Sequence, residues 1–361
     1  MKFLDLFAGI GGFRLGMESA GHKCIGFCEI DKFARASYKA IHNTENEVEM
    51  HDITTISDEF IRGIGDIDVI CGGFPCQAFS IAGKRRGFED TRGTLFFEIA
   101  RFASILRPRY LFLENVKGLL NHEGGATFET ILRALDELGY DVEWQVLNSK
   151  DYVPQNRERV FIVGHLRRER TRKIFPFERN DRKAVELQGQ SNSVNTITAR
   201  YGEAAGVGSY VVESKQQEQI AVGGLYTNDS KKFNRGVLTD LSRTLKSQSH
   251  DAAILIKEAT TKGYAEALPG DSVNISHPNS ETRRGRVGKG IANTLLTGEE
   301  QAVVTDNYRI RKLTPRECWR LQGFPDWAFD RAKEVNSDSQ LYKQAGNSVT
   351  VPVIADIAKR L

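Results

Sequence analysis

The sequence has no long apolar run and few cysteines, and both absences narrow the class of protein. No stretch of its 361 residues approaches the roughly 18 consecutive apolar residues of a membrane-spanning helix. The first residues, MKFLDLFAGIGG, carry neither the basic region nor the apolar stretch of a signal peptide. The five cysteines are an odd number for a disulfide framework, and Cys24 and Cys28 have no second pair that would complete a zinc site. We therefore expect a cytoplasmic protein with free thiols, no membrane segment and no bound metal.

The sequence also lacks a large excess of positive or negative charge, because the formal net charge is only +3. The overall balance therefore identifies no binding partner. Basic residues nevertheless gather at 83–93, 165–173 and 280–290. Any one of these clusters is more typical of a solvated face, but three of them together favour a surface that follows phosphate groups.

Strand-like and helix-like patterns alternate in the first part of the chain. Apolar, strand-like runs lie at 2–8, 23–30, 68–74, 110–116, 141–148 and 158–166, and helical patterns lie between them at 11–21, 31–42, 95–107 and 128–140. This alternation predicts a doubly wound α/β domain with a mostly parallel sheet and helices on both faces.

The chain changes character after about residue 175. Gly, Ser, Thr and Asn become frequent, and a loose repeat of Thr-Ile or Thr-Leu, a polar turn and a β-branched run is marked by Thr196, Thr244 and Thr294. As local structure, the copies are typical of β-hairpins. We expect a small hairpin-rich domain over 176–329. The helical pattern at the C-terminus is expected to return to the first sheet, so that 330–361 completes the domain formed by 1–175.

A glycine-rich turn follows the first strand. In DLFAGIGGFRLG (5–16), Gly9, Gly11 and Gly12 allow positive φ and close approach of a ligand to the N-terminus of a helix. The spacing is not the full dinucleotide fingerprint, and acidic residues such as Glu29 and Asp52 are more often caps or surface groups. Their order after successive strands nevertheless favours a cofactor that contains adenosine.

Cys76 is the candidate nucleophile. It follows Pro75 at the end of a predicted strand, where glycines let a flat substrate approach, whereas Cys71 within the strand is the typical core cysteine. Near backbone N–H groups and the basic segment 83–87, its thiol pKa can fall and its thiolate can attack.

Acid–base partners for Cys76 are predicted at neighbouring strand ends. Glu114, followed by Asn115, ends a strand at the same sheet edge, where partial burial favours its protonated form and proton donation to a ring nitrogen. Farther along, VPQNRERVFIVG places Arg157 and Arg159 on one face of a strand, where guanidinium groups can hold a carbonyl oxygen or a phosphate.

Taken in order, these motifs resemble the DNA (cytosine-5)-methyltransferases of bacterial and phage modification systems. The resemblance covers nearly the whole chain and rests on DLFAGIGGFRLG, GGFPCQAFS, RGTLFFEIARF, ENV, QNRER, RKLTPRECWRLQGFP and QLYKQAGNSVTVPV. Region 176–308 corresponds to the variable target-recognition region of the family. Its Thr-Leu copies are similar to the repeated hairpins of multispecific Bacillus-phage members.

The resemblance implies a reaction and a set of site residues. Cys76 adds to C6 of a flipped cytosine, Glu114 acts at N3, Arg159 contacts O2 and Arg157 supports the site. S-adenosylmethionine is the implied methyl donor. The implied cofactor site consists of Phe7, Ala8, Gly9, Gly11, Glu29, Ile30, Asp52, Ile53, Pro75, Asn347 and Val349.

The implied partner is double-stranded DNA. The residues expected to bind it are chosen by the resemblance to the family and by their positive charge. Arginines at 283, 284 and 286 suit bidentate contacts to guanine. The full expected set is Gln77, Ser80, Lys84, Arg85, Arg86, Arg283, Arg284, Arg286 and Thr294. A restriction endonuclease of the same system is a further expected partner, without direct contact, and the protein is expected to be a monomer.

Other functions compete with this interpretation. An RNA cytosine-5 methyltransferase shares the motifs but has little sequence in the hairpin-rich region. A non-catalytic DNA-binding regulator would not need Cys76, Glu114 and Arg159. A nicotinamide-dependent oxidoreductase requires a fuller glycine fingerprint and leaves Pro-Cys-Gln unexplained.

Overall fold

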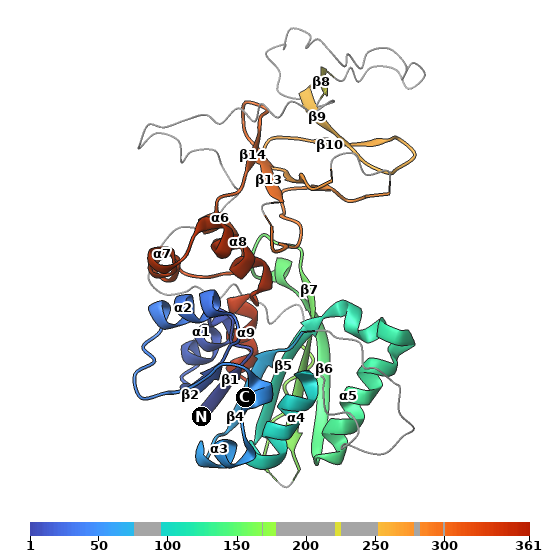
Figure 1. Ribbon diagram of the computed structural model, residues 1–361. Helices are drawn as coiled ribbons and strands as arrows, with labels where there is room; N and C mark the ends of the chain where they lie inside the picture. The colour runs from blue at the N-terminus through green and yellow to red at the C-terminus, as the bar shows by residue number, and fades with distance from the viewer. Residues whose placement is uncertain (76–94, 168, 178–220, 225–251, 278–281, 299) are drawn as a thin grey trace. The chain divides into compact units, whose positions relative to one another are not determined.

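The computed structural model describes residues 1–75, 95–167, 169–177, 221–224, 252–277, 282–298 and 300–361 (Figure 1). The chain divides into two compact units. The large unit comprises 1–153, 157–186 and 315–361, and the small unit comprises 154–156 and 187–314.

The large unit contains a seven-stranded sheet. Its strands are β1 (Lys2–Leu6), β2 (Lys23–Cys28), β3 (Val48–Met50), β4 (Val69–Gly73), β5 (Tyr110–Val116), β6 (Tyr140–Asn148) and β7 (Glu158–Leu166). The order across the sheet is β3-β2-β1-β4-β5-β7-β6. Neighbouring strands from β3 to β5 are parallel, whereas β7 runs antiparallel to both β5 and β6. The direction of winding reverses between β1 and β4, which defines the switch point of a doubly wound sheet.

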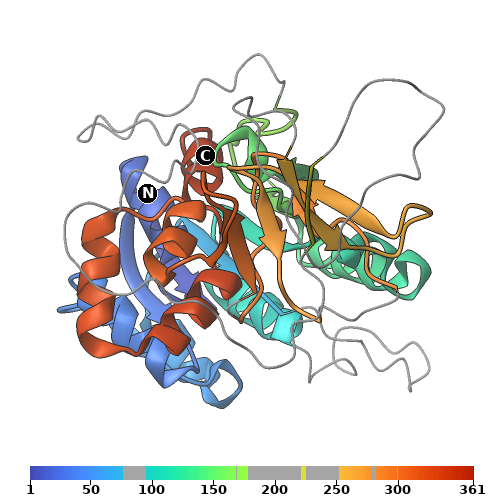
Figure 2. The ribbon, with the colours of Figure 1, turned by 90° about the horizontal axis from the view of Figure 1, so that it is seen from above.

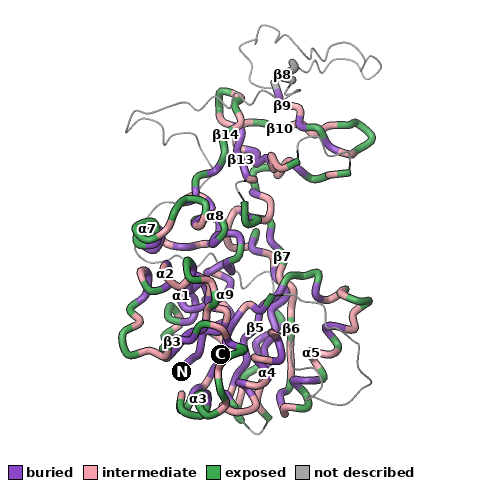
Figure 3. Tube along the Cα trace, viewed as in Figure 1, coloured by how far each residue is buried: buried purple, intermediate pink, exposed green. Residues whose placement is uncertain are grey.

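Alternating side chains of the sheet feed two hydrophobic cores. On β1, Phe3 belongs to one core while Leu4 and Leu6 belong to the other, as the period of a strand requires. Figure 3 shows the central strands of this sheet mostly buried, whereas the edge strand β6 is largely of intermediate burial. The helices are α1 (Gly12–Ser19), α2 (Lys32–Ile41), α3 (Asp58–Gly63), α4 (Leu95–Leu106), α5 (Ala126–Glu137), α6 (Pro315–Leu321), α7 (Asp326–Val335), α8 (Asp338–Asn347) and α9 (Val351–Ala358). The predicted fold class is therefore confirmed.

The C-terminal helices pack beside the N-terminal ones, although hundreds of residues separate them in sequence (Figure 2). α9 lies on α1, and α7 lies on α2. A Cβ at Gly16 of α1 would lie 2.6 Å from Cβ of Ile354, so close packing of α1 on α9 requires a glycine at this position. The C-terminal segment is thereby part of the first sheet's covering layer.

The large unit begins again at Pro315, earlier than the expected boundary at residue 330. Trp319 of α6 is fully buried and donates its indole N–H to the carbonyl of Leu341 in α8 at 3.0 Å. The ring also packs edge-on against Phe324 and Phe329. These aromatic contacts join α6 and α7 to the C-terminal helices, which a reading of local helical patterns does not reveal.

The strands that the structure describes in the small unit pair antiparallel, and its isolated bridge between Gln155 and Ala292 is parallel. One sheet has the order β10-β9-β8, with β8 (Ala221–Gly224), β9 (Ala252–Lys257) and β10 (Tyr264–Ala267). The other has the order β12-β11-β13-β14, with β11 (Ser272–Asn274), β12 (Val287–Gly288), β13 (Gln301–Val304) and β14 (Ile310–Lys312). A core of Ile254, Ile256, Ala267, Val273 and Val304 holds them.

The third copy of the Thr-Leu repeat is not a hairpin of its own. Its β-branched run forms β13, which pairs with β11 and β14, while Ala292 near the start of the copy forms a bridge with Gln155. The threonines of the other two copies, Thr196 and Thr244, lie outside the described residues. Within the described segments, no helix has the length and apolar character needed to cross a membrane.

Candidate active site and cofactor site

The predicted site residues of the large unit gather at the carboxyl edge of the sheet, around the switch point. The glycine-rich turn follows β1, Pro75 follows β4, and Glu114 lies near the end of β5. Val349 returns to the same place from the C-terminal segment. A Cβ at Gly12 would lie 2.8 Å from its Cγ2, and one at Gly73 would lie 3.9 Å from its Cγ1. This edge is where doubly wound proteins bind ligands.

The turn after β1 has a left-handed backbone at three positions. Phe7 has φ of 55°, Gly9 of 56° and Gly11 of 84°. No atom lies within 4 Å of a Cβ position built on Gly9, so the space above this residue is open. A Cβ on Gly11 would instead collide with the imidazole ring of buried His42. The two glycines therefore differ in what they allow. Gly9 leaves open space above the turn, whereas Gly11 allows the turn to pack closely against His42.

Glu29 holds this turn through its carboxylate. Its Oε2 accepts from the N–H of Gly9 at 2.7 Å, and its Oε1 accepts from the N–H of Asp31 at 2.8 Å. Burial raises the pKa of Glu29, and the two backbone N–H groups oppose that shift. A carboxylate has about four lone-pair sites, so Glu29 can still accept hydrogen bonds from a ligand.

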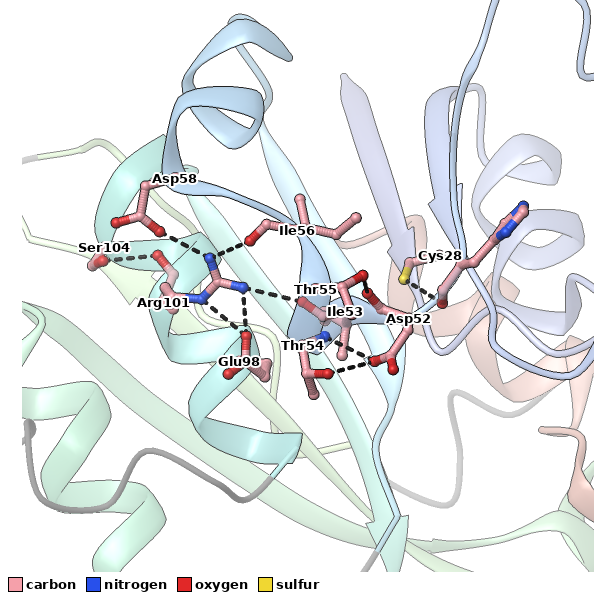
Figure 4. A network of polar contacts seen from close by, with 11 residues as sticks. Cys28, Asp52, Ile53, Thr54, Thr55, Ile56, Asp58, Glu98, Arg101 and Ser104 are labelled. Atoms are coloured by element: carbon pink, nitrogen blue, oxygen red, sulfur yellow. Dashed lines mark hydrogen bonds and ion pairs between the residues drawn. The ribbon is translucent and has the colours of Figure 1, made fainter.

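Asp52 is placed by the short 3₁₀ helix η1 (Ile53–Thr55), which it caps (Figure 4). Its Oδ1 accepts from the N–H of Thr54 at 3.0 Å and from the hydroxyl of Thr54 at 2.7 Å. Ile53 itself is buried in the sheet core, so only its backbone is placed to contact a ligand. Ile30, next to Glu29, is 67% exposed, which is unusual for a large apolar side chain, and Asn347 is exposed as well.

Glu114 and Arg159 form a buried ion pair at the end of β5 and the start of β7. Nε of Arg159 lies 3.1 Å from Oε1 of Glu114, and only 7% of Glu114 is exposed. Burial raises the pKa of Glu114, and the charges of Arg159 and Arg157 oppose the rise. Burial also lowers the pKa of Arg159. A buried carboxyl group with a raised pKa and two arginine neighbours is typical of functional sites.

Arg157 is a buried link to the C-terminal segment. Its guanidinium donates to the carbonyl oxygens of Gly346 at 3.1 Å and Ser348 at 2.8 Å. Burial and the neighbouring charge of Arg159 lower its pKa to about 9. Arg157 therefore fixes the backbone beside Val349, while Arg159 is the arginine that contacts Glu114 directly.

Asn115 positions the end of β4. Gly73 is paired with Glu114, and the chain leaves the sheet at Pro75, which has no N–H for the ladder. The side-chain amide of Asn115 donates to the carbonyl of Phe74 at 2.8 Å, and its oxygen accepts from the N–H of Val116 at 2.8 Å. The side chain of Asn115 thus extends the connection between β4 and β5 by one residue beyond the Gly73–Glu114 pair. Cys76, the next residue after Pro75, lies outside the described residues.

The expected DNA-binding residues fall into two groups. Gln77, Ser80, Lys84, Arg85 and Arg86 lie outside the described residues. Arg283, Arg284, Arg286 and Thr294 belong to the small unit, where they have distinct environments.

Arg286 differs from the expectation of a guanine-reading side chain. It is buried, with 6% exposure, and its guanidinium donates to the carbonyls of Asn274 and Lys257, both at 3.1 Å. Arg284 is exposed and donates from Nε to the carbonyl of Ala259 at 2.7 Å. Arg286 thus supports the sheet, and Arg284 remains the better candidate for a DNA contact.

Arg283 and Thr294 have contacts inside the small unit as well. Arg283 donates to Oδ1 of Asn274 at 3.2 Å, and the hydroxyl of Thr294 donates to the carbonyl of Asn156 at 2.7 Å. Gln155 accepts from the N–H of Leu295 at 3.0 Å. The Thr-Leu pair is therefore attached to the segment that directly precedes Arg157 in the sequence.

The sequence does not predict two residues, His42 and Arg101, that contact the backbone of the proposed cofactor site. His42 lies beneath Gly11, and Arg101 holds the residues after Asp52 (Figure 4). A pattern around Arg101 was visible, since Glu98 precedes it at the helical spacing of three. That pattern indicates only a surface ion pair.

Comparison with known proteins shows that the chain is similar to DNA methyltransferases. The family model described as C-5 cytosine-specific DNA methylase matches residues 1–361. The chain is 37% identical to the type II methyltransferase M1.ScrFI of Lactococcus lactis subsp. cremoris, covering 100% of this chain and 77% of that protein. It is 35% identical to the type II methyltransferase M.HhaI of Haemophilus parahaemolyticus, covering 99% and 93%.

Further similarity comes from a phage protein and from a solved structure. The orphan methyltransferase M.SPRI of Bacillus phage SPR is 32% identical, with 100% of this chain and 97% of that protein covered. The S. pombe Dnmt2 methyltransferase structure has a TM-score of 0.55 at 16% identity and covers 99% of this chain and 97% of its own, which supports the fold alone. The sequence matches confirm the resemblance: the chain belongs to the C-5 cytosine-specific DNA methylase family, whose members transfer a methyl group from S-adenosylmethionine to C5 of cytosine in DNA.

Proposed function

We propose that the chain methylates cytosine by covalent catalysis, with Cys76 as nucleophile and Glu114 as proton donor. The observation that carries the proposal is the buried Glu114–Arg159 pair at the end of β5. Glu114 is paired in register with Gly73, two residues before Pro75 and three before Cys76. The acid and the chain segment that carries the thiol therefore leave the sheet side by side.

Each residue has one task in the reaction. The Cys76 thiolate forms a bond to C6 while Glu114 gives a proton to N3, so the ring electrons collect at C5. Arg159 holds the cytosine O2 and keeps Glu114 in place. After C5 has taken the methyl group, its proton leaves to a base such as water. The Cys76–C6 bond then breaks, the C5–C6 double bond returns, and Glu114 recovers its proton.

The residues after β1, β2 and β3 suit S-adenosylmethionine. The open space above Gly9 admits a ligand, Glu29 retains lone pairs for ribose hydroxyls, and exposed Ile30 offers an apolar face to the adenine. Asp52 would accept from the adenine amino group. The remaining members of the proposed site are Phe7, Ala8, Gly11, Ile53, Pro75, Asn347 and Val349. The cofactor supplies a methyl group on a positively charged sulfur, which is electrophilic.

The target cytosine must leave the helix to reach this site, because C5 and C6 are not accessible inside stacked DNA. We propose that the small unit selects the sequence around that base, with Arg284 as an exposed candidate for a DNA contact. The other proposed DNA-binding residues are Gln77, Ser80, Lys84, Arg85, Arg86, Arg283 and Thr294. Duplex DNA that carries a single modified cytosine is accordingly the substrate for the decisive test.

The test is covalent trapping on DNA that contains 5-fluorocytosine, in the presence of S-adenosylmethionine. Fluorine at C5 cannot leave as a proton does, so the protein stays attached at C6 and migrates as a larger species on a denaturing gel. We expect the wild-type chain to be trapped and Cys76→Ser to show no adduct. Cys318→Ser, which changes a buried thiol in α6, is the matched control and should still be trapped. A complex that survives Cys76→Ser would overturn the mechanism.

We also propose that the protein acts in the cytoplasm as a monomer and belongs to a modification system in which a separate endonuclease cuts unmethylated sites. The type II methyltransferases among its relatives support this setting. Sedimentation equilibrium with and without DNA tests the monomer, and co-purification from the native host tests for any direct contact with an endonuclease. A dimer at micromolar concentration would contradict the first point.

A further inference from the structure

Arg101 of α4 is the centre of a polar network beside the segment that follows Asp52 (Figure 4). We propose that Arg101 is a positioning residue for the cofactor, which acts by holding the backbone that presents Asp52. The proposal rests on the proposed function, since it takes Asp52 as a cofactor contact.

The guanidinium of Arg101 uses all five of its N–H donors. Nε donates to Oε2 of Glu98 at 2.9 Å, and one terminal nitrogen donates to the same oxygen at 2.6 Å and to the carbonyl of Ile53 at 3.1 Å. The other terminal nitrogen donates to the carbonyl of Ile56 and to Oδ1 of Asp58, both at 2.8 Å. A guanidinium group has five N–H bonds in a fixed plane, so this network is fully satisfied.

The segment depends on Arg101 because it has little secondary structure of its own. η1 spans three residues, and a helix this short leaves its last carbonyls without partners inside the helix. Arg101 binds the carbonyl of Ile53, the first residue of η1, and that of Ile56, the residue that follows η1. On the other side of Asp52, the thiol of Cys28 donates to the carbonyl of His51 at 3.3 Å. Asp52 is therefore held from both sides.

Lysine cannot replace this arginine fully. Its ammonium group has three donors on a flexible stem and lacks the planar fork that reaches two carbonyls and two carboxylates at once. Burial works against the charge of Arg101, but its hydrogen bonds to the carboxylates of Glu98 and Asp58, together with their charges, outweigh burial and raise its pKa. The guanidinium thus stays charged at any pH at which the enzyme works.

Loss of Arg101 should release the segment without melting α4. The opposite face of this helix is buried in the core through Phe96, Ile99, Phe102 and Ala103. Among these four side chains, Phe102 alone contacts the guanidinium, whose central carbon lies 5.6 Å from the ring centroid. The expected effect is therefore on the cofactor rather than on the folded state as a whole.

The experiment compares Arg101→Gln and Arg101→Lys with Arg133→Gln. Arg133 forms an exposed pair with Glu129 on α5 at 2.7 Å and serves as the matched control, because it lies in no proposed site. Calorimetric titration with S-adenosylmethionine should show a Kd raised about tenfold for Arg101→Gln and less for Arg101→Lys, with no change for Arg133→Gln. At saturating cofactor, kcat and the Kd for DNA should stay within about twofold of wild type.

A double-mutant cycle with Asp52→Ala separates positioning from general stability. If Arg101 acts through Asp52, the two substitutions together should raise the cofactor Kd little more than Asp52→Ala alone. Additive effects, or an Arg101→Gln variant that loses kcat and thermal stability at unchanged Kd, would overturn the proposal. Arg101→Lys keeps the charge and gives the same test if the glutamine variant folds poorly. Trapping by Cys76 reports separately on the covalent mechanism.

Discussion

Glu29 and Glu114 lie on the same edge of the sheet, on opposite sides of the switch point, and their surroundings differ. Burial raises the pKa of both Glu29 and Glu114. Backbone N–H groups of Gly9 and Asp31 oppose the shift at Glu29, whereas the side chains of Arg159 and Arg157 oppose it at Glu114. Backbone donors neither titrate nor move away, so Glu29 suits a fixed acceptor. Arginine side chains can turn toward a substrate, so Glu114 suits proton transfer. The partners, rather than the residue type, thus distinguish the proposed cofactor contact from the proposed proton donor.

Replacing each glutamate by glutamine should separate the two roles most strongly. We expect Glu114→Gln to lower turnover by about a thousandfold, because an amide cannot donate its proton to N3 in the same way. Its Kd for S-adenosylmethionine should change less than about twofold. Glu29→Gln should do the reverse and raise the cofactor KM about tenfold at nearly unchanged kcat. Steady-state kinetics with varied cofactor, alongside calorimetry, make the comparison. Equal loss of turnover and cofactor affinity in Glu114→Gln would remove the distinction.

A smaller effect is expected from substitution of Asn115, which contacts the segment before Cys76 and is not part of the proposed cofactor site. Asn115→Ala leaves the carbonyl of Phe74 without its donor, so the backbone before Cys76 loses its alignment with Glu114. Formation of the 5-fluorocytosine adduct should slow by about ten- to a hundredfold, with cofactor Kd unchanged. Asn336→Ala is the control, because Asn336 makes the same kind of bond to the carbonyl of Phe33 at 2.9 Å, outside the proposed active site. Equal adduct rates in the two variants would exclude a positioning role for Asn115.

The smallest effect is expected on folding stability, through His42, which packs against Gly11 in the turn after β1. Burial, followed by the charge of Arg14, lowers the pKa of His42 to about 3. The unfolded chain binds a proton at this residue below about pH 6.5 and the folded chain does not, so folding stability falls as the pH drops from there toward 3. At pH 5 the residue should cost about 2 kcal/mol relative to pH 8. Urea unfolding of wild type and His42→Asn at both pH values measures it. The wild type should lose more stability than the variant, and parallel losses would show that His42 titrates normally.

The elements and the strand-end residues could be predicted because they depend on local patterns. Apolar periodicity fixes the strands, and the carboxyl ends of parallel strands share one edge, which brings Glu29, Asp52 and Glu114 to it. The antiparallel direction of β7 is not a local property, since it follows from pairing with β5 and β6.

Arg284 and Arg286 show where sequence reasoning stops. They are two positions apart in one basic cluster, yet Arg284 is exposed and Arg286 is buried against carbonyls of residues 257 and 274. Arg101 poses the same difficulty, because its acceptors at Ile53 and Ile56 precede it by 48 and 45 residues. Such roles are set by tertiary partners that neither charge nor spacing identifies.

The attachment of Arg157 to the carbonyls of Gly346 and Ser348 has a consequence for synthesis of the enzyme. While a ribosome is still translating the residues before 346, Arg157 lacks these acceptors, Gly12 lacks Val349, and α1 lacks α9. Glu114 and the glycine-rich turn have been translated by then, but the sheet edge that they share still lacks these contacts. This edge of the sheet therefore reaches its final packing only after the C-terminal helices have folded back onto α1 and α2.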